Sequence, residues 1–159
     1  MVRNFVEADD TSVAALVERA YGRSYEAWLI RALRKNNDIA IEYVLEKEDH
    51  IIGHISFAAH KSPYGWWSLC TVAVAEEERN QGFGSQLVRQ GLEFARQSEA
   101  CAITVLGSAA FYQRFGFTRN AARNLDTPFS LENTLLNPIK PHVAGRKAVL
   151  EYPRAFSRL

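Results

Sequence analysis

Residues 79–84 carry residue types and a spacing that suit a chemical role. They read Arg-Asn-Gln-Gly-Phe-Gly and stand between an apolar stretch and an amphipathic one. Gly82 and Gly84 lack a Cβ atom, so the backbone can approach a ligand closely and direct successive N–H groups at it. The helix that follows from Ser85 adds free N–H groups and the positive end of its dipole, and Arg79 adds a guanidinium. The segment therefore predicts a loop that binds phosphate oxygens.

Such a loop could belong to any of three nucleotide-binding motifs, and a plain turn is a fourth interpretation. A P-loop requires Gly, four residues and then Gly-Lys-Ser or Gly-Lys-Thr, and the chain contains no such run. A dinucleotide fingerprint requires a third glycine where Leu87 stands. A kinase glycine-rich loop belongs to a longer signature than this chain holds. By itself, the pair Gly82 and Gly84 leaves phosphate binding and a tight turn both open.

Hydrophobic periodicity predicts the elements that flank this loop. The stretch Trp67–Val74 is almost wholly apolar, which suits a central strand. A helix from Ser85 to Ser98 places four apolar side chains on one face, namely Leu87, Val88, Leu92 and Ala95. The loop is therefore expected to join a buried strand to a helix that packs on the sheet.

Strands and helices also alternate through the rest of the chain. Before the loop we expect a strand at Val2–Val6, capping side chains at residues 8–11, helices at Ser12–Tyr21 and at Tyr25–Arg34 (burying Trp28), and a hairpin of Ile39–Glu46 with Ile51–Ala59. After it we expect a strand at Ala102–Leu106, a short helix at Ala109–Arg114, a loop at Asn120–Pro128, and strands at Phe129–Leu135 and Lys147–Tyr152. These elements predict an α/β fold, a mixed sheet with helices on its faces, in a single domain over residues 1–159.

The composition and net charge limit the kinds of binding partner that we expect. The 159 residues are 47% hydrophobic and 23% charged, with a net charge of +1, so no large field predicts a nucleic-acid or anionic-membrane partner. No apolar run approaches the ~18 residues that span a bilayer. The two cysteines, Cys70 and Cys101, lie in apolar runs and are expected to be reduced and buried, as in a cytoplasmic protein.

A second motif follows the loop about one helix and one strand later. Residues 111–117 read Phe-Tyr-Gln-Arg-Phe-Gly-Phe. Together with Arg-x-x-Gly-x-Gly at 79–84, this segment resembles the two motifs of the GNAT superfamily of acyl-CoA-dependent N-acetyltransferases, and the order of elements agrees. Val105-Leu106-Gly107 before it and Tyr152-Pro153-Arg154-Ala155-Phe156 near the end are similar to a bacterial subgroup of undefined substrate.

The resemblance implies a fold and a donor site. The GNAT fold is an α/β (α+β) fold with a mixed, mostly antiparallel sheet of about six or seven strands and helices on both faces. In this family the strand before the loop pairs with the pantetheine arm of acetyl-CoA, and the loop holds its pyrophosphate. By position, the implied binding residues are Val72, Ala73, Val74, Arg79, Asn80, Gln81, Gly82, Phe83, Gly84 and Ser85.

The resemblance also implies catalytic roles. Tyr112 matches the position that the family commonly uses as general acid toward the departing thiolate, and a phenol with a pKa of ~10 suits that donor. Packing beneath the cofactor is the alternative for Tyr112. Many members carry a carboxylate base on the strand before the loop, and Trp66–Val74 has none. His54 on the neighbouring strand is our candidate base, and a water chain ending on Ser68 or Thr71 stays open.

The expected reaction is direct attack of an amine on acetyl-CoA in a ternary complex. The acceptor is a small molecule or a peptide amine, and the residues do not decide between them. A non-catalytic acyl-CoA-binding or sensing module is the alternative, because the strand carboxylate is missing. The motifs require no metal. Several members of the family pair as homodimers, and the oligomeric state stays open at this point.

Overall fold

The computed structural model of the protein describes residues 1–158. Contacts divide the chain into two compact units. Unit 1 consists of Met1–Phe57 and Cys70–Leu92, and unit 2 consists of Ala58–Leu69 and the chain from Glu93 onward. Each unit is described by itself below.

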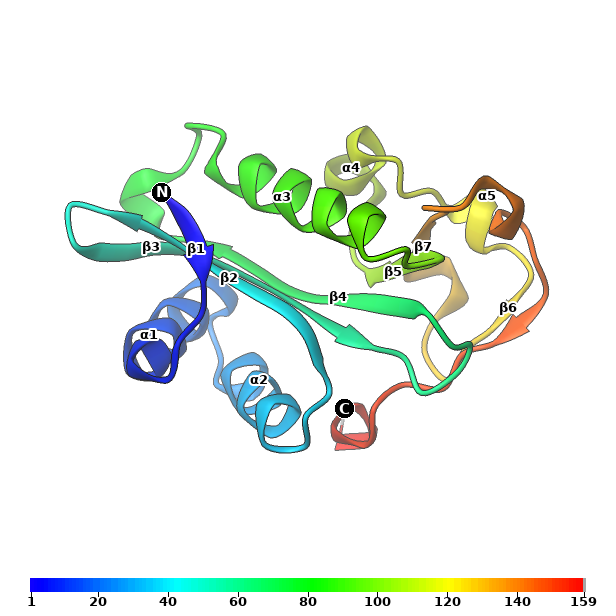
Figure 1. Cartoon of the computed structure of the whole chain (residues 1–159), viewed down its shortest axis with the longest axis horizontal. Coiled ribbons are helices and arrows are strands. Elements are labelled where there is room, and N and C mark those ends of the chain that lie inside the picture. The colour runs from blue at the N-terminus through cyan, green and yellow to red at the C-terminus, as the bar shows by residue number, and fades with distance from the viewer. Residues whose placement is uncertain (159) are drawn as a thin grey trace. The chain divides into compact units, whose positions relative to one another are not determined.

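The main sheet has six strands, hydrogen-bonded in the order β1-β2-β3-β4-β5-β7 (Figure 1). Its strands are β1 (Val2–Asn4), β2 (Ile39–Lys47), β3 (His50–Ala59), β4 (Trp66–Val74), β5 (Ala102–Leu106) and β7 (Thr134–Asn137). Val2 pairs with Leu45 in an antiparallel register. The pair β4–β5 is parallel, from Trp66 opposite Ala102 to Leu69 opposite Val105, and β5 runs antiparallel to β7. The mixed, mostly antiparallel sheet predicted from the sequence is confirmed.

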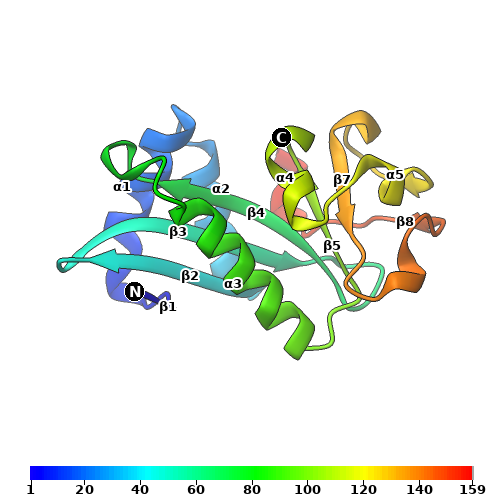
Figure 2. The ribbon, with the colours of Figure 1, turned by 90° about the horizontal axis from the view of Figure 1, so that it is seen from above.

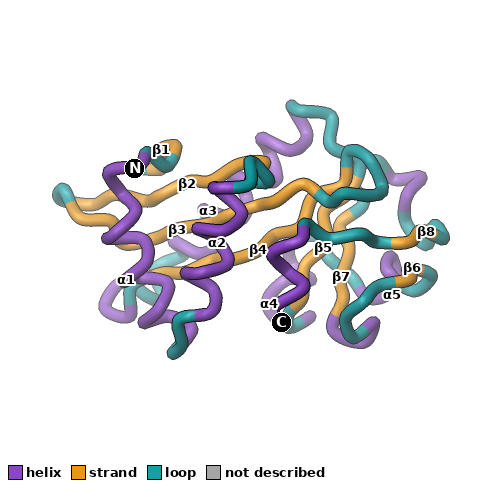
Figure 3. Tube along the Cα trace, turned by 90° about the horizontal axis from the view of Figure 1, so that it is seen from below, coloured by secondary structure: helices purple, strands orange, loops and turns teal. Residues whose placement is uncertain are grey.

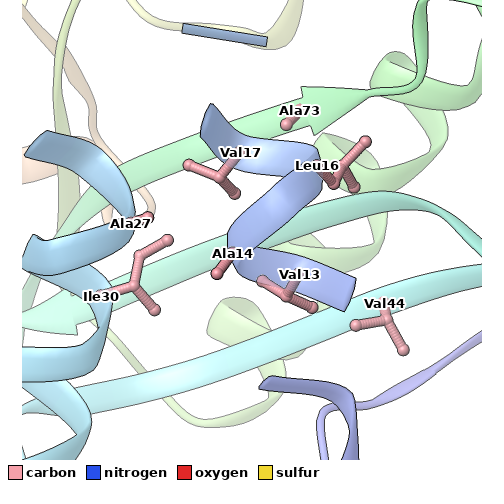
Figure 4. Packing of buried hydrophobic residues seen from close by; sticks show 8 residues of the cluster. All are labelled: Val13, Ala14, Leu16, Val17, Ala27, Ile30, Val44 and Ala73. Carbon is pink, nitrogen blue, oxygen red and sulfur yellow. The ribbon is translucent and has the colours of Figure 1, made fainter. Parts of the chain in front are cut away.

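Helices cover both faces of the strands in unit 1. The helices α1 (Asp10–Tyr21) and α2 (Tyr25–Lys35) lie on one face, and the first part of α3 (Phe83–Gln97) lies on the other (Figures 1 and 2). Below the sheet, a buried cluster joins the two helices to β2 and β4, with Val13, Val17, Ile30, Val44 and Ala73 among its members (Figure 4).

Small residues let α3 lie close to β3 on the opposite face. A Cβ atom on Gly53 would come within 3.0 Å of Leu87 Cδ1, and one on Gly91 would overlap the ring of Phe57. Leu87, Val88, Leu92 and Ala95 are all buried, so the predicted apolar face of this helix is confirmed. The helix begins at Phe83, two residues earlier than expected.

In unit 2, β5 is followed by α4 (Ala109–Tyr112), α5 (Arg119–Ala122), β6 (Leu125–Asp126) and β8 (Ala148–Val149). The strands β6 and β8 form a separate two-stranded parallel sheet beside α5 (Figure 3). Leu125 lies opposite Ala148, and Asp126 lies opposite Val149.

The C-terminal third differs most from the sequence-based expectation. The segment expected to be a loop at 120–128 contains α5 and β6, and the strand expected at Phe129–Leu135 is β7, which begins only at Thr134. The strand expected at Lys147–Tyr152 pairs over two residues only, because Glu151 then exchanges backbone hydrogen bonds with Ser62 instead. The bounds of these strands are set by hydrogen-bond partners far along the chain and not by the strands' own pattern of apolar residues.

Two expectations near the N-terminus were wrong. Trp28 was expected to be buried, yet 38% of its surface is exposed on α2. The side chains at 8–11 do not cap α1: Asp9 precedes that helix, but its carboxylate accepts hydrogen bonds from Arg3 and from the Val6 N–H, 2.9 Å away. The charged partner Arg3 therefore competes with the capping role.

Candidate active site

Beyond Leu69, β4 presents an edge that β5 does not pair. The parallel register ends at Leu69 opposite Val105, and β4 continues to Val74. On the other edge, the Ala75 N–H donates to the Ile52 carbonyl of β3 at 2.8 Å. Since the main-chain groups of successive strand residues point to opposite edges, Val72 and Val74 direct theirs to the edge away from β3.

Side chains of unit 1 occupy this edge. The Val72 N–H donates to the Tyr21 hydroxyl at 3.2 Å, and the same hydroxyl lies 3.4 Å from the Val72 carbonyl oxygen. The Arg79 Nε donates to the Val74 carbonyl oxygen at 3.2 Å. A ligand with amide groups could replace these side chains without breaking the sheet. The main chain of Ala73 faces β3, and its side chain is buried.

Two residues of the loop between β4 and α3 have left-handed backbone angles. Asn80 has a φ of 65° and Gly82 a φ of 84°, so both lie in the left-handed region. The Gln86 N–H donates to the Gly82 carbonyl, which is the first turn of the helix. The N–H groups of Phe83, Gly84 and Ser85 precede that bond and have no carbonyl one turn earlier in the helix. They form the donor cluster that an anion would need.

Charges near the loop are partly neutralised. Three glutamates precede the loop, and Lys47 Nζ lies 2.9 Å from Glu78 Oε1. Gln81 also donates to Glu78, at 3.4 Å, while Asn80 and Gly82 are exposed. A Cβ atom on Gly82 would meet no atom within 4 Å, so the loop is open to an approaching ligand at this point.

Tyr112, the expected general acid, lies in unit 2 at the end of α4 and is half-buried. Its ring packs edge-to-face against Phe111 at 4.9 Å and Phe117 at 5.7 Å. A Cβ atom on Gly107 would come within 2.8 Å of the Tyr112 ring, so the glycine lets the ring pack on the backbone. The aromatic residues of this motif therefore hold the phenol in one orientation.

His54, the expected base, lies inside unit 1 with none of its surface exposed. Its Nε2 atom lies 2.6 Å from a carboxylate oxygen of Glu42, and Arg34 donates to both oxygens of that carboxylate, at 2.9 and 2.7 Å. Burial opposes ionisation of Glu42, but the hydrogen bonds from His54 and Arg34 outweigh it and lower the pKa of that carboxyl. Thr71, an alternative end for a water chain, is also buried and contacts Ser56 Oγ at 2.6 Å.

Sequence reasoning missed a group of residues at the turn between α1 and α2. Tyr21 reaches Val72, and Tyr25 has a buried hydroxyl with no hydrogen-bond partner among residues 1–158. Glu26 is buried and forms an ion pair with Arg23. No local pattern marks these residues, because Tyr21 and Val72 stand 51 positions apart.

Two features are absent from the part of the chain that the structure describes. Within it, no group of three or more His, Cys, Asp or Glu side chains could hold a metal ion. None of the helices between residues 1 and 158 has the length and apolar character needed to span a membrane. Neither Cys70 nor Cys101 is disulfide-bonded within the described residues, and both are half-buried rather than buried as expected.

Similarity to a known protein family, together with the geometry above, defines the class of this protein. The family model described as acetyltransferase (GNAT) family matches residues 7–117. The chain therefore belongs to this family, which confirms the resemblance expected from the two motifs. It is an N-acetyltransferase by family, and the family's reaction is transfer of an acyl group from acyl-CoA.

Bacterial relatives agree with this assignment. The chain is 30% identical over 129 residues to the uncharacterized N-acetyltransferase YhbS of Escherichia coli K12, covering 79% of this chain and 77% of that protein. It is 32% identical over 119 residues to the uncharacterized N-acetyltransferase YjhQ of the same strain, covering 70% and 65%. The expected similarity to bacterial acetyltransferases of undefined substrate is confirmed.

Solved structures confirm the fold. A crystal structure of Escherichia coli YhbS in complex with CoA superposes with a TM-score of 0.92 at 26% identity, covering 100% of this chain and 92% of that one. A GNAT acetyltransferase from Brucella melitensis in complex with acetyl-CoA gives a TM-score of 0.81 at 24% identity, covering 98% and 97%.

Proposed function

We propose that this protein transfers the acetyl group of acetyl-CoA to a primary amine by direct attack in a ternary complex. The proposal rests on one observation within unit 1. The open edge of β4 leads into a loop, and the N–H groups where this loop enters α3 have no helical carbonyl to bond to. The CoA bound by YhbS and the acetyl-CoA bound by the Brucella protein support this choice of donor.

The open edge of β4 would bind the pantetheine arm as an added strand. The Val72 carbonyl and the main chain of Val74 would exchange hydrogen bonds with its amide groups once Tyr21 and Arg79 release them, which leaves the Val72 N–H for the thioester. The loop would hold the pyrophosphate through main-chain N–H groups and one guanidinium, supplied by residues from Arg79 to Ser85, namely Arg79, Asn80, Gln81, Gly82, Phe83, Gly84 and Ser85. Ala73 would act only as the spacer between the two binding residues.

The chemistry requires a polarised carbonyl and two proton transfers. The amine nitrogen bonds to the thioester carbon, the C–S bond breaks, and the thiolate takes up a proton as the amine loses one. The Val72 N–H would polarise the thioester oxygen. We assign to Tyr112 the donation of the proton to the thiolate, on the resemblance of its motif.

The expectation that His54 is the general base finds little support in the geometry. A base must come within hydrogen-bonding reach of the amine, directly or through one water. His54 has no exposed surface and is bonded to Glu42, which Arg34 holds. We therefore propose a structural role for His54, namely to share the buried carboxylate with Arg34.

Unit 2, taken by itself, contains a hollow that could hold a small molecule. Its volume is about 600 Å³, within the range of small-molecule sites. It is lined by the carboxyl-bearing residues Asp126 and Glu151, by Arg154, and by three aromatic residues, Phe129, Tyr152 and Phe156. Aromatic faces and carboxylates both attract an ammonium group, which suits an amine with an apolar body.

The proposal also includes a cellular location and an oligomeric state. Cys70 and Cys101 are not disulfide-bonded within the described residues, as in a reducing compartment, which supports a cytoplasmic location. Recovery of the protein from a periplasmic or extracellular fraction would contradict this location. A homodimer remains a proposal from the family alone, and light scattering of the purified protein would give a monomer mass if it is wrong.

The first experiment is a thermal shift of the purified protein with acetyl-CoA, CoA, NAD and ATP in parallel. A ligand at ~100 times its dissociation constant stabilises the folded state by ~2.7 kcal/mol, so acetyl-CoA and CoA should raise the melting temperature and the other two should not. Absence of any shift with CoA would contradict the donor site.

A thiol-release assay then separates catalysis from binding. Acetyl-CoA is incubated with apolar primary amines, with amino acids and with peptide N-termini, and free CoA is measured. We expect amine-dependent release, largest for the apolar small amines. Binding of acetyl-CoA with no release for any amine would favour the non-catalytic binding module instead.

A further inference from the structure

The Tyr21 hydroxyl bonds to both main-chain groups of one residue on the open edge of β4. It accepts from the Val72 N–H at 3.2 Å and lies within donating distance of the Val72 carbonyl oxygen at 3.4 Å. A ligand that forms hydrogen bonds with the Val72 main chain must therefore displace this hydroxyl. Val72 N–H is also the group to which we assign polarisation of the thioester.

The end of α1 holds Tyr21 in this place. Tyr21 is the last residue of α1, and Gly22 follows with a φ of 71° and an N–H that donates to the Glu18 carbonyl. This left-handed cap ends the helix and turns the chain toward α2, which begins at Tyr25. The phenol is thus carried by a packed helix rather than by a mobile loop.

The phenol keeps its proton at neutral pH. Tyr21 is 37% exposed, but partial burial still raises its pKa. The hydrogen bond with the Val72 backbone lowers the pKa by less than burial raises it, and Glu26, Cys70 and Arg23 have smaller effects of both signs. A hydroxyl with a raised pKa stays a hydrogen-bond donor over the whole physiological range. It therefore offers an O–H beside the Val72 N–H.

We propose that Tyr21 is a catalytic residue that donates a second hydrogen bond to the thioester oxygen, beside the Val72 N–H. The inference rests on the proposed function. The acyl oxygen replaces the hydroxyl as acceptor of the Val72 N–H, and the O–H of Tyr21 turns from the Val72 carbonyl to that oxygen. The side chain and the main chain together then form an oxyanion hole.

The electron balance requires nothing further. When the amine nitrogen bonds to the carbonyl carbon, the C=O electron pair moves to oxygen, where both hydrogen bonds stabilise the negative charge. When the C–S bond breaks, the pair returns to re-form the carbonyl. Tyr21 donates a hydrogen bond throughout and gives up no proton.

The neighbouring Tyr25 provides a matched control. It lies four residues later at the start of α2, and its hydroxyl is buried without a hydrogen-bond partner in the part of the chain that the structure describes. Its ring lies 5.9 Å from that of Trp28. Tyr25→Phe therefore removes a hydroxyl from the same region without removing a contact to β4.

The test compares Tyr21→Phe and Tyr25→Phe with the parent protein by two measurements. In the thiol-release assay, Tyr21→Phe should lower kcat on the order of 100-fold, the effect of losing one oxyanion donor, and change KM for acetyl-CoA little. In difference infrared spectra of bound [1-¹³C]acetyl-CoA, the parent should lower the carbonyl stretching frequency, and Tyr21→Phe should reverse part of that shift. Tyr25→Phe should match the parent in both.

The outcomes are separable. A kcat within threefold of the parent, or an unchanged carbonyl frequency, would overturn the role of Tyr21 while the proposed function stands. Tighter acetyl-CoA binding with unchanged kcat in Tyr21→Phe would show that the hydroxyl only blocks Val72. Failure of the parent itself to bind acetyl-CoA would refute the proposed function and the inference with it.

Discussion

Tyrosines of this chain take different roles because their hydroxyls meet different surroundings. The hydroxyl of Tyr21 bonds to the main chain of β4, that of Tyr25 is buried with no partner among the described residues, and Tyr64 is 98% exposed. Tyr112 stands among the aromatic residues of its motif. At the scale of single residues, position relative to a main-chain edge or a packed ring determines what a phenol can do.

Replacing Tyr112 by Phe tests its assigned role as general acid. The change keeps the ring that packs on Phe111 and Phe117, so the fold should be retained. Loss of the proton donor should lower kcat at least 10-fold, since general acid catalysis contributes typically 10²–10⁴-fold, with little change in acetyl-CoA affinity. Steady-state thiol release and a binding titration measure the two quantities.

Tyr64→Phe is the control for Tyr112→Phe, because it removes a hydroxyl from an exposed ring. It should leave both quantities unchanged. Equal turnover in the two variants would return Tyr112 to a packing role beneath the cofactor.

At the scale of elements, one strand and the helix after it supply most of the proposed donor site. The strand β4 presents Val72 and Val74 on its open edge, and α3 begins at Phe83 with N–H groups free of helical acceptors. The left-handed residues Asn80 and Gly82 make the reversal between the two elements. Backbone geometry, rather than side-chain charge, is therefore the main determinant of anion binding here.

Gly82→Ala tests the loop as an element. At a φ of 84° a Cβ atom costs about 1 kcal/mol, but it meets no atom of the free protein within 4 Å. The variant should therefore fold with a slightly lower melting temperature. Because the methyl group obstructs close approach of a ligand, the dissociation constant for CoA should rise at least 10-fold, as measured by calorimetric titration.

Gly65→Ala is the matched control for the loop variant. Gly65 has nearly the same φ, 81°, and lies in unit 2, where its Cβ atom would meet Cys101 Sγ at 3.3 Å. It should cost similar or greater stability and leave CoA affinity unchanged. If both variants bind CoA equally well, the loop at 79–85 does not hold the pyrophosphate.

At the scale of the whole molecule, buried titratable groups link stability to pH. His60 is 6% exposed, its Nε2 atom lies 2.7 Å from Thr104 Oγ1, and its ring contacts Tyr152 edge-on. Burial lowers the pKa of His60 to about 4, against an opposing hydrogen bond with the backbone of Glu151. Between pH 6.5 and 4, the unfolded chain therefore binds a proton that the folded protein does not.

Stability should accordingly fall as the pH is lowered through this window. The contribution of His60 to the free energy of unfolding should be constant above about pH 6.5. It should decrease by about 2 kcal/mol between pH 7 and pH 5. The lowered pKa of Glu42 contributes only at still lower pH, below the ordinary range of a glutamate. Urea denaturation at the two pH values measures the difference.

His60→Gln isolates the contribution of this histidine. Glutamine keeps a group that can hydrogen-bond to Thr104 but does not titrate, so the variant should lose about 2 kcal/mol less than the parent between pH 7 and pH 5. The same loss in both proteins would assign the pH dependence to other groups.

The sequence by itself determined the family, the order of most elements and the loop at 79–84. It also predicted the buried face of α3. These features depend on local patterns: the spacing of apolar residues in a helix, and glycines where the backbone needs a left-handed turn. The same locality explains why the nine helices and strands from β1 to α4 were predicted within a few residues.

Only the tertiary structure decided which residues meet across the sequence. It placed Tyr21 on Val72, exposed Trp28, enclosed His54 with Glu42, and paired β8 with β6 over two residues only. Each of these depends on a partner far along the chain, and a hydrogen bond between residues 51 positions apart leaves no periodic signal in either segment. The candidate oxyanion donor Tyr21 could therefore be found only once the strand edge and the helix end were seen together.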